Sequence, residues 1–435
     1  MKKKKRKKRK NHFLNIMLTF GGVFTGVMIL GILAFLLLWK IGDERADGNS
    51  LDKPAEAVSN MVVETIPEQE ENLPDQEQYI EETLPEEPKG KYDDILSNPE
   101  YMLENNIYAK ETAKEKEVTI AFAGDILFDP YYSVMSRLLQ RENGIHDSIS
   151  EDLMNEMISA DIMMINNEFP YSGRGTPTEG KQFTFRAKPE YASILQEMGV
   201  DIVSLANNHA YDYGEEAFLD TLDTLSGIEM PYVGAGRNLE EAACPVYFIA
   251  GDMKIAIVSA TQIERLDNPD TKGATDATPG VFRCLDPAKL LEVVQEAKEN
   301  SDFVIVYIHW GTENTAEIDW LQRDQAPKIA DAGADLIIGD HPHCLQPIDY
   351  VNGIPVVYSL GNFWFNSKEV DTCLVKAVID ESGLRSLQFV PALQKGCTTT
   401  MLHDGEKERV LNYMRSISPG VNIDEEGFVT GKPKG

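Results

Sequence analysis

The segment from Asn11 to Trp39 contains no Asp, Glu, Lys or Arg, and no other feature limits the possible structure as strongly. Within it, the 24 residues from Ile16 to Trp39 are apolar apart from two threonines. About 20 residues suffice to cross a hydrocarbon core of ~30 Å. In lipid each backbone polar group must be paired within the segment, which a single span achieves only as a helix. We therefore predict a transmembrane helix over residues 13–39.

The flanking charges predict how this helix is oriented. Residues 2–10 are nine consecutive Lys or Arg residues, and acidic residues follow the apolar run. By the positive-inside rule, the tail of residues 1–12 stays in the cytoplasm. The alternative is a cleaved signal peptide with an apolar part of roughly 7–15 residues and a small-x-small site, which Leu36 to Lys40 does not offer. We expect a single-pass protein of the cell membrane whose main domain is extracytoplasmic.

Composition divides the rest of the chain. The formal net charge is −30, and such an acidic surface repels nucleic acid, so no nucleic-acid partner is expected. Residues 40–115 are predicted to be an acidic disordered linker, because they are rich in Glu, Gln and Pro and poor in aromatic residues. Residues 116–395 are predicted to form one domain. Residues 396–435 are predicted to form a weakly patterned tail with one helix at Glu406 to Ser416.

Two smaller patterns bear on assembly and redox state. Gly22 and Gly26 form a GxxxG motif, which can pair two membrane helices into a dimer, although glycine is common in such helices without pairing. The five cysteines form no CxxC motif and are scattered through the domain. An external domain of this size permits disulfides without requiring them, so mostly free, buried thiols are expected.

From Val118 onward, short β-branched runs alternate with helical stretches. Apolar strands that alternate with helices indicate an α/β fold with sheets covered on both faces. Two later segments, Thr372 to Asp380 and Leu384 to Pro391, are predicted to be antiparallel strands. The other predicted strands begin at Val118, Ile162, Asp201, Lys254, Phe303, Asp335 and Pro355, and helices are predicted at Glu190 to Met198, Glu215 to Leu225 and Pro287 to Glu299.

Polar and metal-competent residues follow the ends of these strands. Open α/β sheets place ligands beyond the carboxyl ends of their strands. Four of the seven histidines fall there, and with three oxygen donors they make a mixed nitrogen and oxygen set suited to one or two divalent Zn, Mn or Fe ions. The candidate ligands are Asp125, Glu168, Asn208, His209, His309, His341 and His343.

The order of these motifs carries a resemblance. Gly124-Asp125, Asn167-Glu168, Ala206-Asn207-Asn208-His209, His309-Trp310-Gly311, His341-Pro342-His343 and Ser359-Leu360-Gly361-Asn362-Phe363 follow one another along the chain. In this order they resemble the CapA family of poly-γ-glutamate capsule biosynthesis proteins, from about Val118 to Gln394. The family is similar in fold to calcineurin-like metallophosphoesterases, which implies a four-layer α/β sandwich with two metals at the strand ends.

The resemblance also implies roles for single residues. Asp125 and His343 would serve one metal, and Glu168 would stand in the place of the bridging carboxylate. Asn208, His309 and His341 would serve the second metal, and His209 would act on the scissile group as general acid or electrostatic clamp. The sequence departs from the phosphoesterase pattern at Leu127, where that pattern has histidine, at Glu168, where it has aspartate, and in lacking its arginine, for which Arg186 could substitute.

Five further residues are predicted to bind substrate or support the ligands: Asn167, Arg186, Trp310, Glu313 and Asn362. Trp310 is equally able to pack in the interior. Three functions stay open. The first is a metal-dependent, hydrolase-like enzyme acting on poly-γ-glutamate during its synthesis or export. The second is a non-catalytic accessory subunit that binds the polymer or a membrane synthase complex. The third is a general phosphoesterase of the envelope.

Overall fold

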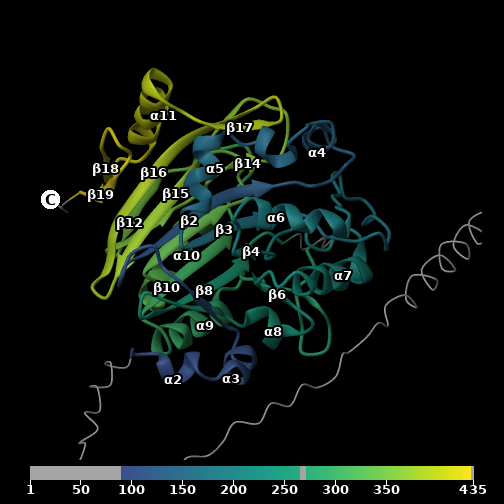
Figure 1. The fold of residues 1–435 in the computed structure, drawn as a ribbon, viewed down its shortest axis with the longest axis horizontal. Helices are drawn as coiled ribbons and strands as arrows, with labels where there is room; N and C mark the ends of the chain where they lie inside the picture. The colour runs from purple at the N-terminus through teal and green to yellow at the C-terminus, as the bar shows by residue number, and fades with distance from the viewer. Residues whose placement is uncertain (1–89, 265–270, 433–435) are drawn as a thin grey trace, which may run out of the picture. The chain divides into compact units, whose positions relative to one another are not determined.

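Short runs of β-branched and aromatic residues form the strands at the centre of the fold, because such side chains pack well on a pleated surface. The computed structural model describes residues 90–264 and 271–432, all within one compact unit, Thr83–Gly435. Most of the strands join two large sheets (Figure 1). The predicted α/β class is confirmed.

The first sheet has seven strands, with a parallel group at its centre. In spatial order they are β1 (Ile107–Lys110), β7 (Val246–Ala250), β8 (Met253–Thr261), β10 (Phe303–His309), β11 (Leu336–Asp340), β13 (Ile354–Val357) and β12 (Ile348–Val351). Strands β8, β10, β11 and β13 are parallel to one another. Strands β7 and β12 run antiparallel to their neighbours β8 and β13.

The second sheet has eight strands and combines parallel with antiparallel pairing. In spatial order its path is β17 (Thr398–Met401), β16 (Gly383–Lys395), β15 (Val370–Asp380), β2 (Val118–Ile126), β3 (Ile162–Asn167), β4 (Ile202–Ser204) and β5 (Tyr232–Val233), and β14 (Asn362–Trp364) pairs with β2 off this path. Strands β2 to β5 are parallel. The two predicted antiparallel strands are confirmed as β15 and β16.

Three apolar clusters define four layers, helix, sheet, sheet and helix (Figure 1). One cluster lies between the two sheets and contains Phe122 and Ile305. A second packs β2 to β4 against α4 (Ser133–Leu138), α5 (Glu151–Ile158), α6 (Ser193–Glu197) and α7 (Gly214–Gly227). The third packs β8, β10 and β11 against α8 (Leu239–Ala243), α9 (Ala288–Glu299) and α10 (Trp320–Ala332).

The remaining elements are short or peripheral. They are α2 (Asp93–Leu96), α3 (Pro99–Glu104), α11 (Asp404–Ile417), the 3-10 helices η1 (Gly144–Asp147) and η2 (Pro189–Ala192), and two small sheets, β6 (Ala235–Gly236) with β9 (Gly280–Val281) and β18 (Val421–Ile423) with β19 (Val429–Gly431). The helix predicted at Glu406 to Ser416 is confirmed as α11.

The domain extends beyond the predicted limits at residues 116 and 395. β1 pairs with β7 as an edge strand, so part of the predicted linker belongs to the first sheet. At the other end β17 pairs with β16, and α11 buries Val410 and Met414 in the core between the sheets. The predicted boundaries were therefore wrong, because the stability of these segments comes from non-local pairing that short local patterns do not reveal.

Gly124 brings two chain segments together at the end of β2. A Cβ at this position would lie 1.8 Å from the carbonyl oxygen of Gly361, so only glycine fits. The Asp125 N–H donates to that same carbonyl at 3.2 Å. This close approach places the end of β2 beside β14.

Among the described residues no helix is long and apolar enough to cross a bilayer. The predicted tail (1–12), transmembrane helix (13–39) with its GxxxG motif, and linker up to residue 89 lie outside the described residues. All five cysteines lie inside them and have free thiols, and three are buried, as expected: Cys284, Cys373 and Cys397.

Candidate metal centre

The ends of four parallel strands, two from each sheet, bring the candidate ligands together. Asp125 lies near the end of β2, and Glu168 directly follows β3. His309 ends β10, and His341 directly follows β11. The two sheets are joined beneath these residues by Tyr307, whose hydroxyl donates to the Ala123 carbonyl at 3.1 Å. The candidate ligands therefore lie together at the strand ends, as the sequence predicted.

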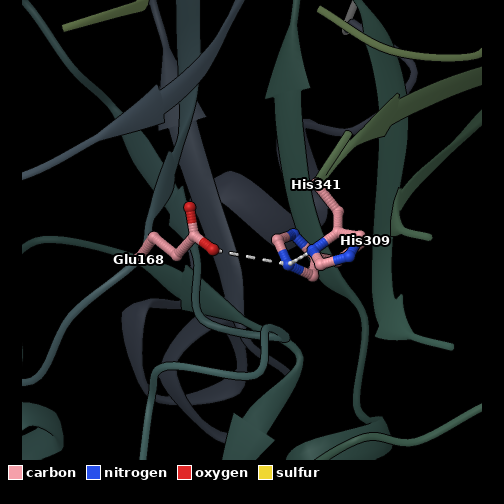
Figure 2. A group of neighbouring side chains, drawn as sticks. All are labelled: Glu168, His309 and His341. Atoms are coloured by element: carbon pink, nitrogen blue, oxygen red, sulfur yellow. Dashed lines mark hydrogen bonds and ion pairs between the residues drawn. The ribbon is translucent and has the colours of Figure 1, made fainter. Parts of the chain in front are cut away.

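One group of ligand atoms consists of Glu168, His309 and His341, which lie within 4.8 Å of one another (Figure 2). The Nε2 of His309 is 3.6 Å from Glu168 Oε1 and 3.1 Å from Nδ1 of His341. Asn208 Oδ1 is 2.8 Å from the same Nε2. Four donor atoms from three loops and one strand therefore face a common point.

A second group consists of Asp125, Glu168 and His343. His343 Nδ1 lies 3.0 Å from Asp125 Oδ2 and 2.8 Å from Asn362 Oδ1. Burial raises the pKa of Asp125, but the hydrogen bond and charge of His343 outweigh it, and the net shift is downward. Glu168 belongs to both groups, as a shared ligand must. Its role as a ligand stays a prediction.

The chemistry of these residues fits divalent ions. Both carboxylate oxygens of Glu168 are buried and have no hydrogen-bond partner among the described residues. An unpaired buried charge costs several kcal/mol, and a cation between the two groups would supply the missing partner. Burial, and then the charges of Asp125 and Asp340, raise the pKa of Glu168 well above its ordinary value.

Two of the histidines, His309 and His341, are in the protonation state that metal binding needs. Burial lowers the pKa of His309 to about 3 and that of His341 well below its ordinary value, so both rings are neutral at pH 7. Neutral imidazole offers a lone pair, and metal binding requires it. His309 Nδ1 lies 2.9 Å from Asp340 Oδ1, and a hydrogen bond there leaves Nε2 free to face the group.

The turn His341-Pro342-His343 holds two rings in an unusual backbone conformation. His341 has a φ of 93° and His343 a φ of 57°. Residues other than glycine adopt such values at a cost of about 1–3 kcal/mol. The turn aims the first ring at the His309 group and the second at Asp125, so each ring serves a different group.

His209 lies at the edge of the cluster. Its Nε2 is 3.9 Å from Glu168 Oε1, and its Nδ1 is 2.7 Å from Asp212 Oδ2. Burial lowers the pKa of His209, although Asp212 acts in the opposite direction. A ring in this position has one nitrogen held by a carboxylate and the other directed at the site, and its role in catalysis stays a prediction.

The supporting residues divide into those that the structure brings to the cluster and those that it does not. Asn362 contacts His343, as described above, and Glu313 is exposed. Burial lowers the pKa of His343, but the hydrogen bond and charge of Asp125, followed by the charge of Glu313, raise it, and the net shift is upward. Asn167 donates to the Phe169 carbonyl at 2.7 Å, and its own side-chain oxygen is buried without a partner among the described residues.

Two of the predicted supporting residues lie apart from the ligands. Trp310 is fully buried in the outer core, where it stacks on Tyr358 and donates to its carbonyl at 2.9 Å. Of its two predicted roles, substrate contact and interior packing, this position fits packing, because the side chain that follows His309 at the end of β10 points to the opposite face. The guanidinium of Arg186 lies 4.2 Å from the centre of the Tyr213 ring and donates to the Arg174 carbonyl.

Sequence reasoning missed two buried carboxylates, Asp340 and Asp212. Asp340 is the last residue of β11 and bonds His309, and one of its oxygens has no partner in the described part of the chain. Its position just before His341 was the available signal. Asp212 carried a weaker signal, its spacing of three residues from His209.

Comparisons with known proteins agree with this picture. The model of the family "Bacterial capsule synthesis protein PGA_cap" matches residues 119–367. The PGA biosynthesis protein CapA of Bacillus subtilis (strain 168) is 30% identical over 288 residues, which cover 65% of this chain and 73% of that protein. The capsule biosynthesis protein CapA of Bacillus anthracis is 34% identical over 245 residues, which cover 54% of this chain and 58% of that protein.

Among solved structures, the protein TT1561 of Thermus thermophilus aligns with a TM-score of 0.36 and 13% identity, over 62% of this chain and 97% of that one. A likeness this distant says nothing about chemistry. The family match, which spans more than half of the chain, confirms the resemblance predicted from the strand-end motifs. The chain therefore belongs to the bacterial capsule synthesis protein family PGA_cap.

Proposed function

We propose that this protein is anchored in the cell membrane by residues 13–39 and acts outside it on poly-γ-glutamate during synthesis or export. It would do so through a metal-dependent, hydrolase-like site. The family and the names of the two Bacillus relatives support the polymer. The observation that carries the site is Glu168, a buried carboxylate that accepts no hydrogen bond from the described residues and is shared by two groups of ligand atoms.

The cluster offers donor atoms for two ions, as a metallophosphoesterase-type site does, although Leu127 stands where that pattern has a histidine. Asp125, His343 and Glu168 would hold one ion, and Glu168, His309, His341 and Asn208 the other. Divalent ions in such sites polarise the bond to be broken and stabilise the negative charge that develops on its oxygen. His209 presents Nε2 on the side of Glu168, where its lone pair would take a proton from the attacking water and then return it to the leaving group.

The negative charge of the chain supports a role for bound cations in binding an anionic polymer. The chain is strongly acidic, and two lysines of the segment that includes the loop over His209 already have carboxylate partners. Lys181 pairs with Asp212, and Lys188 with Glu190. Cations at the cluster would therefore be the groups that attract the carboxylates of poly-γ-glutamate.

A second candidate is a non-catalytic accessory subunit that binds the polymer or a membrane synthase. Burial of the cluster favours it. Asp125, Glu168 and His309 are fully buried, and His209 has an exposed fraction of 6%. His343 is more open, with 17% of its side chain exposed. A substrate would reach the site mainly past His343.

The two candidates are separated by metal content and turnover of the full-length protein in detergent. Bound metal would be measured after purification, and the length of poly-γ-glutamate chains and hydrolysis of a phosphoester would be followed with time. Wild type is compared with His209→Ala and with His403→Ala, a matched control because His403 is exposed and pairs with Asp152 far from the cluster.

The enzyme proposal expects bound divalent metal and turnover that His209→Ala lowers and His403→Ala does not. If wild type holds metal but neither shortens poly-γ-glutamate nor hydrolyses the phosphoester, the accessory role is supported instead. Turnover of the phosphoester alone would instead identify an envelope phosphoesterase. Wild type without metal and without turnover would refute the metal site.

A further inference from the structure

Asp212 is a fully buried carboxylate that joins the edge of the candidate site to a neighbouring loop. Its Oδ2 accepts hydrogen bonds from His209 Nδ1 at 2.7 Å and from the Phe185 N–H at 2.6 Å. Its Oδ1 accepts one from Lys181 Nζ at 2.6 Å. The same side chain therefore contacts the candidate catalytic histidine and two positions of the loop at residues 173–187.

The bond from His209 determines which nitrogen faces the cluster. A carboxylate only accepts hydrogen bonds, so the hydrogen of a neutral His209 ring lies on Nδ1. Nε2 then carries the lone pair and faces Glu168 Oε1 at 3.9 Å. The backbone of His209 is held as well, since its N–H donates to the side-chain oxygen Oδ1 of Asn207 at 3.0 Å.

The loop also packs on the His209 ring. The Phe185 ring centre is 4.3 Å from that of His209, and it meets Phe365 edge-on at 5.5 Å. Phe365 in turn lies 5.1 Å from His343. Two aromatic side chains thus cover the two histidines at the open side of the cluster. Because Phe185 N–H and His209 Nδ1 share one oxygen of Asp212, a shift of the loop changes the support of the ring.

A structural explanation for Asp212 competes with a functional one. A buried pair of Asp212 and Lys181 would hold the loop in place without any contact to a histidine. Such pairs contribute little net stability compared with apolar side chains of similar size. The use of Oδ2 for the histidine, with Oδ1 left to the lysine, favours the functional explanation.

We propose that Asp212 is a positioning residue, which orients His209 toward the cluster and couples this orientation to the loop at residues 173–187. The inference rests on the proposed function, because it assigns His209 a part in the reaction. It adds a residue that the resemblance to phosphoesterases did not supply.

The test compares two double variants of the full-length protein, Lys181→Met/Asp212→Asn and Lys181→Met/Asp212→Ala. Removing the lysine in both avoids an isolated buried charge, which alone would destabilise the fold. The two differ in whether position 212 offers an oxygen to His209. Asp220→Asn is the control, since Asp220 holds the same loop through Ser172 and Arg174 without contacting His209.

Three measurements are made on each variant: bound metal, kcat and KM on the substrate that wild type turns over, and the orientation of His209 in an experimental structure. The alanine variant is expected to keep its metal, to lose about 100-fold or more in kcat with little change in KM, and to show a rotated ring. The asparagine variant is expected to recover at least about tenfold of that loss, and Asp220→Asn to resemble wild type.

An unrotated His209 ring in the alanine variant would overturn the inference, as would a rotated ring with unchanged kcat. Equal losses of kcat in both double variants would also overturn it. They would show that loss of the Lys181–Asp212 ion pair explains the effect, whether or not position 212 offers an oxygen to His209. A wild-type protein that holds metal and turns over no substrate would instead overturn the proposed function, and with it the catalytic use of this contact.

Discussion

Replacing Glu168 by Gln should stabilise the metal-free protein and abolish its response to metal. Both oxygens of Glu168 are buried without a hydrogen-bond partner among the described residues, near Asp125 and Asp340. The pKa of Glu168 in the folded protein lies above its ordinary value of 4.5. Between these two pKa values the unfolded chain has released the proton and the folded chain has not, so the free energy of unfolding falls as pH rises.

The size of the effect follows from burial. A buried polar group without a partner costs about 1–3 kcal/mol, and a charged one more. Glutamine removes the charge, so a gain of about 1–3 kcal/mol is expected at pH 7 and little gain near pH 4. One kcal/mol shifts Tm by about 2–4 °C in a domain of 150–250 residues. For this somewhat larger domain we expect Tm to rise by about 2–8 °C.

The assay is thermal unfolding of EDTA-treated full-length protein in detergent at pH 4, 5.5 and 7, with and without Mn²⁺. At 1,000 times its Kd, a metal adds about 4.1 kcal/mol to wild type, which exceeds the gain expected from glutamine, so the order of stability should reverse when metal is added. Glu313→Gln is the control, because it neutralises an exposed carboxylate and should change stability by less than about 0.5 kcal/mol. A metal-free Glu168→Gln protein less stable than wild type at pH 7 would refute the reasoning.

Three further predictions concern the core and the thiols. Trp310→Ala should lower the free energy of unfolding by about 3–5 kcal/mol and leave the metal content per folded molecule unchanged, which denaturant titration and elemental analysis would check; metal loss at full stability would contradict it. Gly124→Ala should cost more than about 4 kcal/mol, because its Cβ would lie 1.8 Å from a backbone oxygen, and near-normal soluble yield and Tm would refute this. Thiol titration in denaturant without reductant should find five free thiols, and a lower count would reveal a disulfide.

Much of the fold and of the site was predictable because the signals are local. Three apolar runs are long enough to be predicted as strands, those that begin at Val118, Ile162 and Phe303. All three are strands in the structure. The ligands follow strand ends, and parallel strands in adjacent positions place their ends together. Asp125, Glu168 and His309 therefore converge as the sequence indicated.

Other features could not be predicted, since they depend on partners distant in the chain. The four residues of β1 are too few to predict as a strand, and their partner β7 (Val246–Ala250) lies far along the chain. Trp310 stands beside a ligand in sequence and points into the opposite core. Asp212 shows its function only when residues 173–187 fold back onto it.

The sequence by itself determined the class of fold, the family and the edge of the sheets at which polar residues gather, because strand periodicity and motif order are properties of the linear chain. Only the tertiary structure decided that Glu168 is shared by two groups of ligand atoms and that Asp212 joins His209 to Lys181 and Phe185. Those relations depend on distances of a few ångströms between side chains from different strands and loops. Such distances are set by the packing of two sheets against each other, which no local pattern encodes.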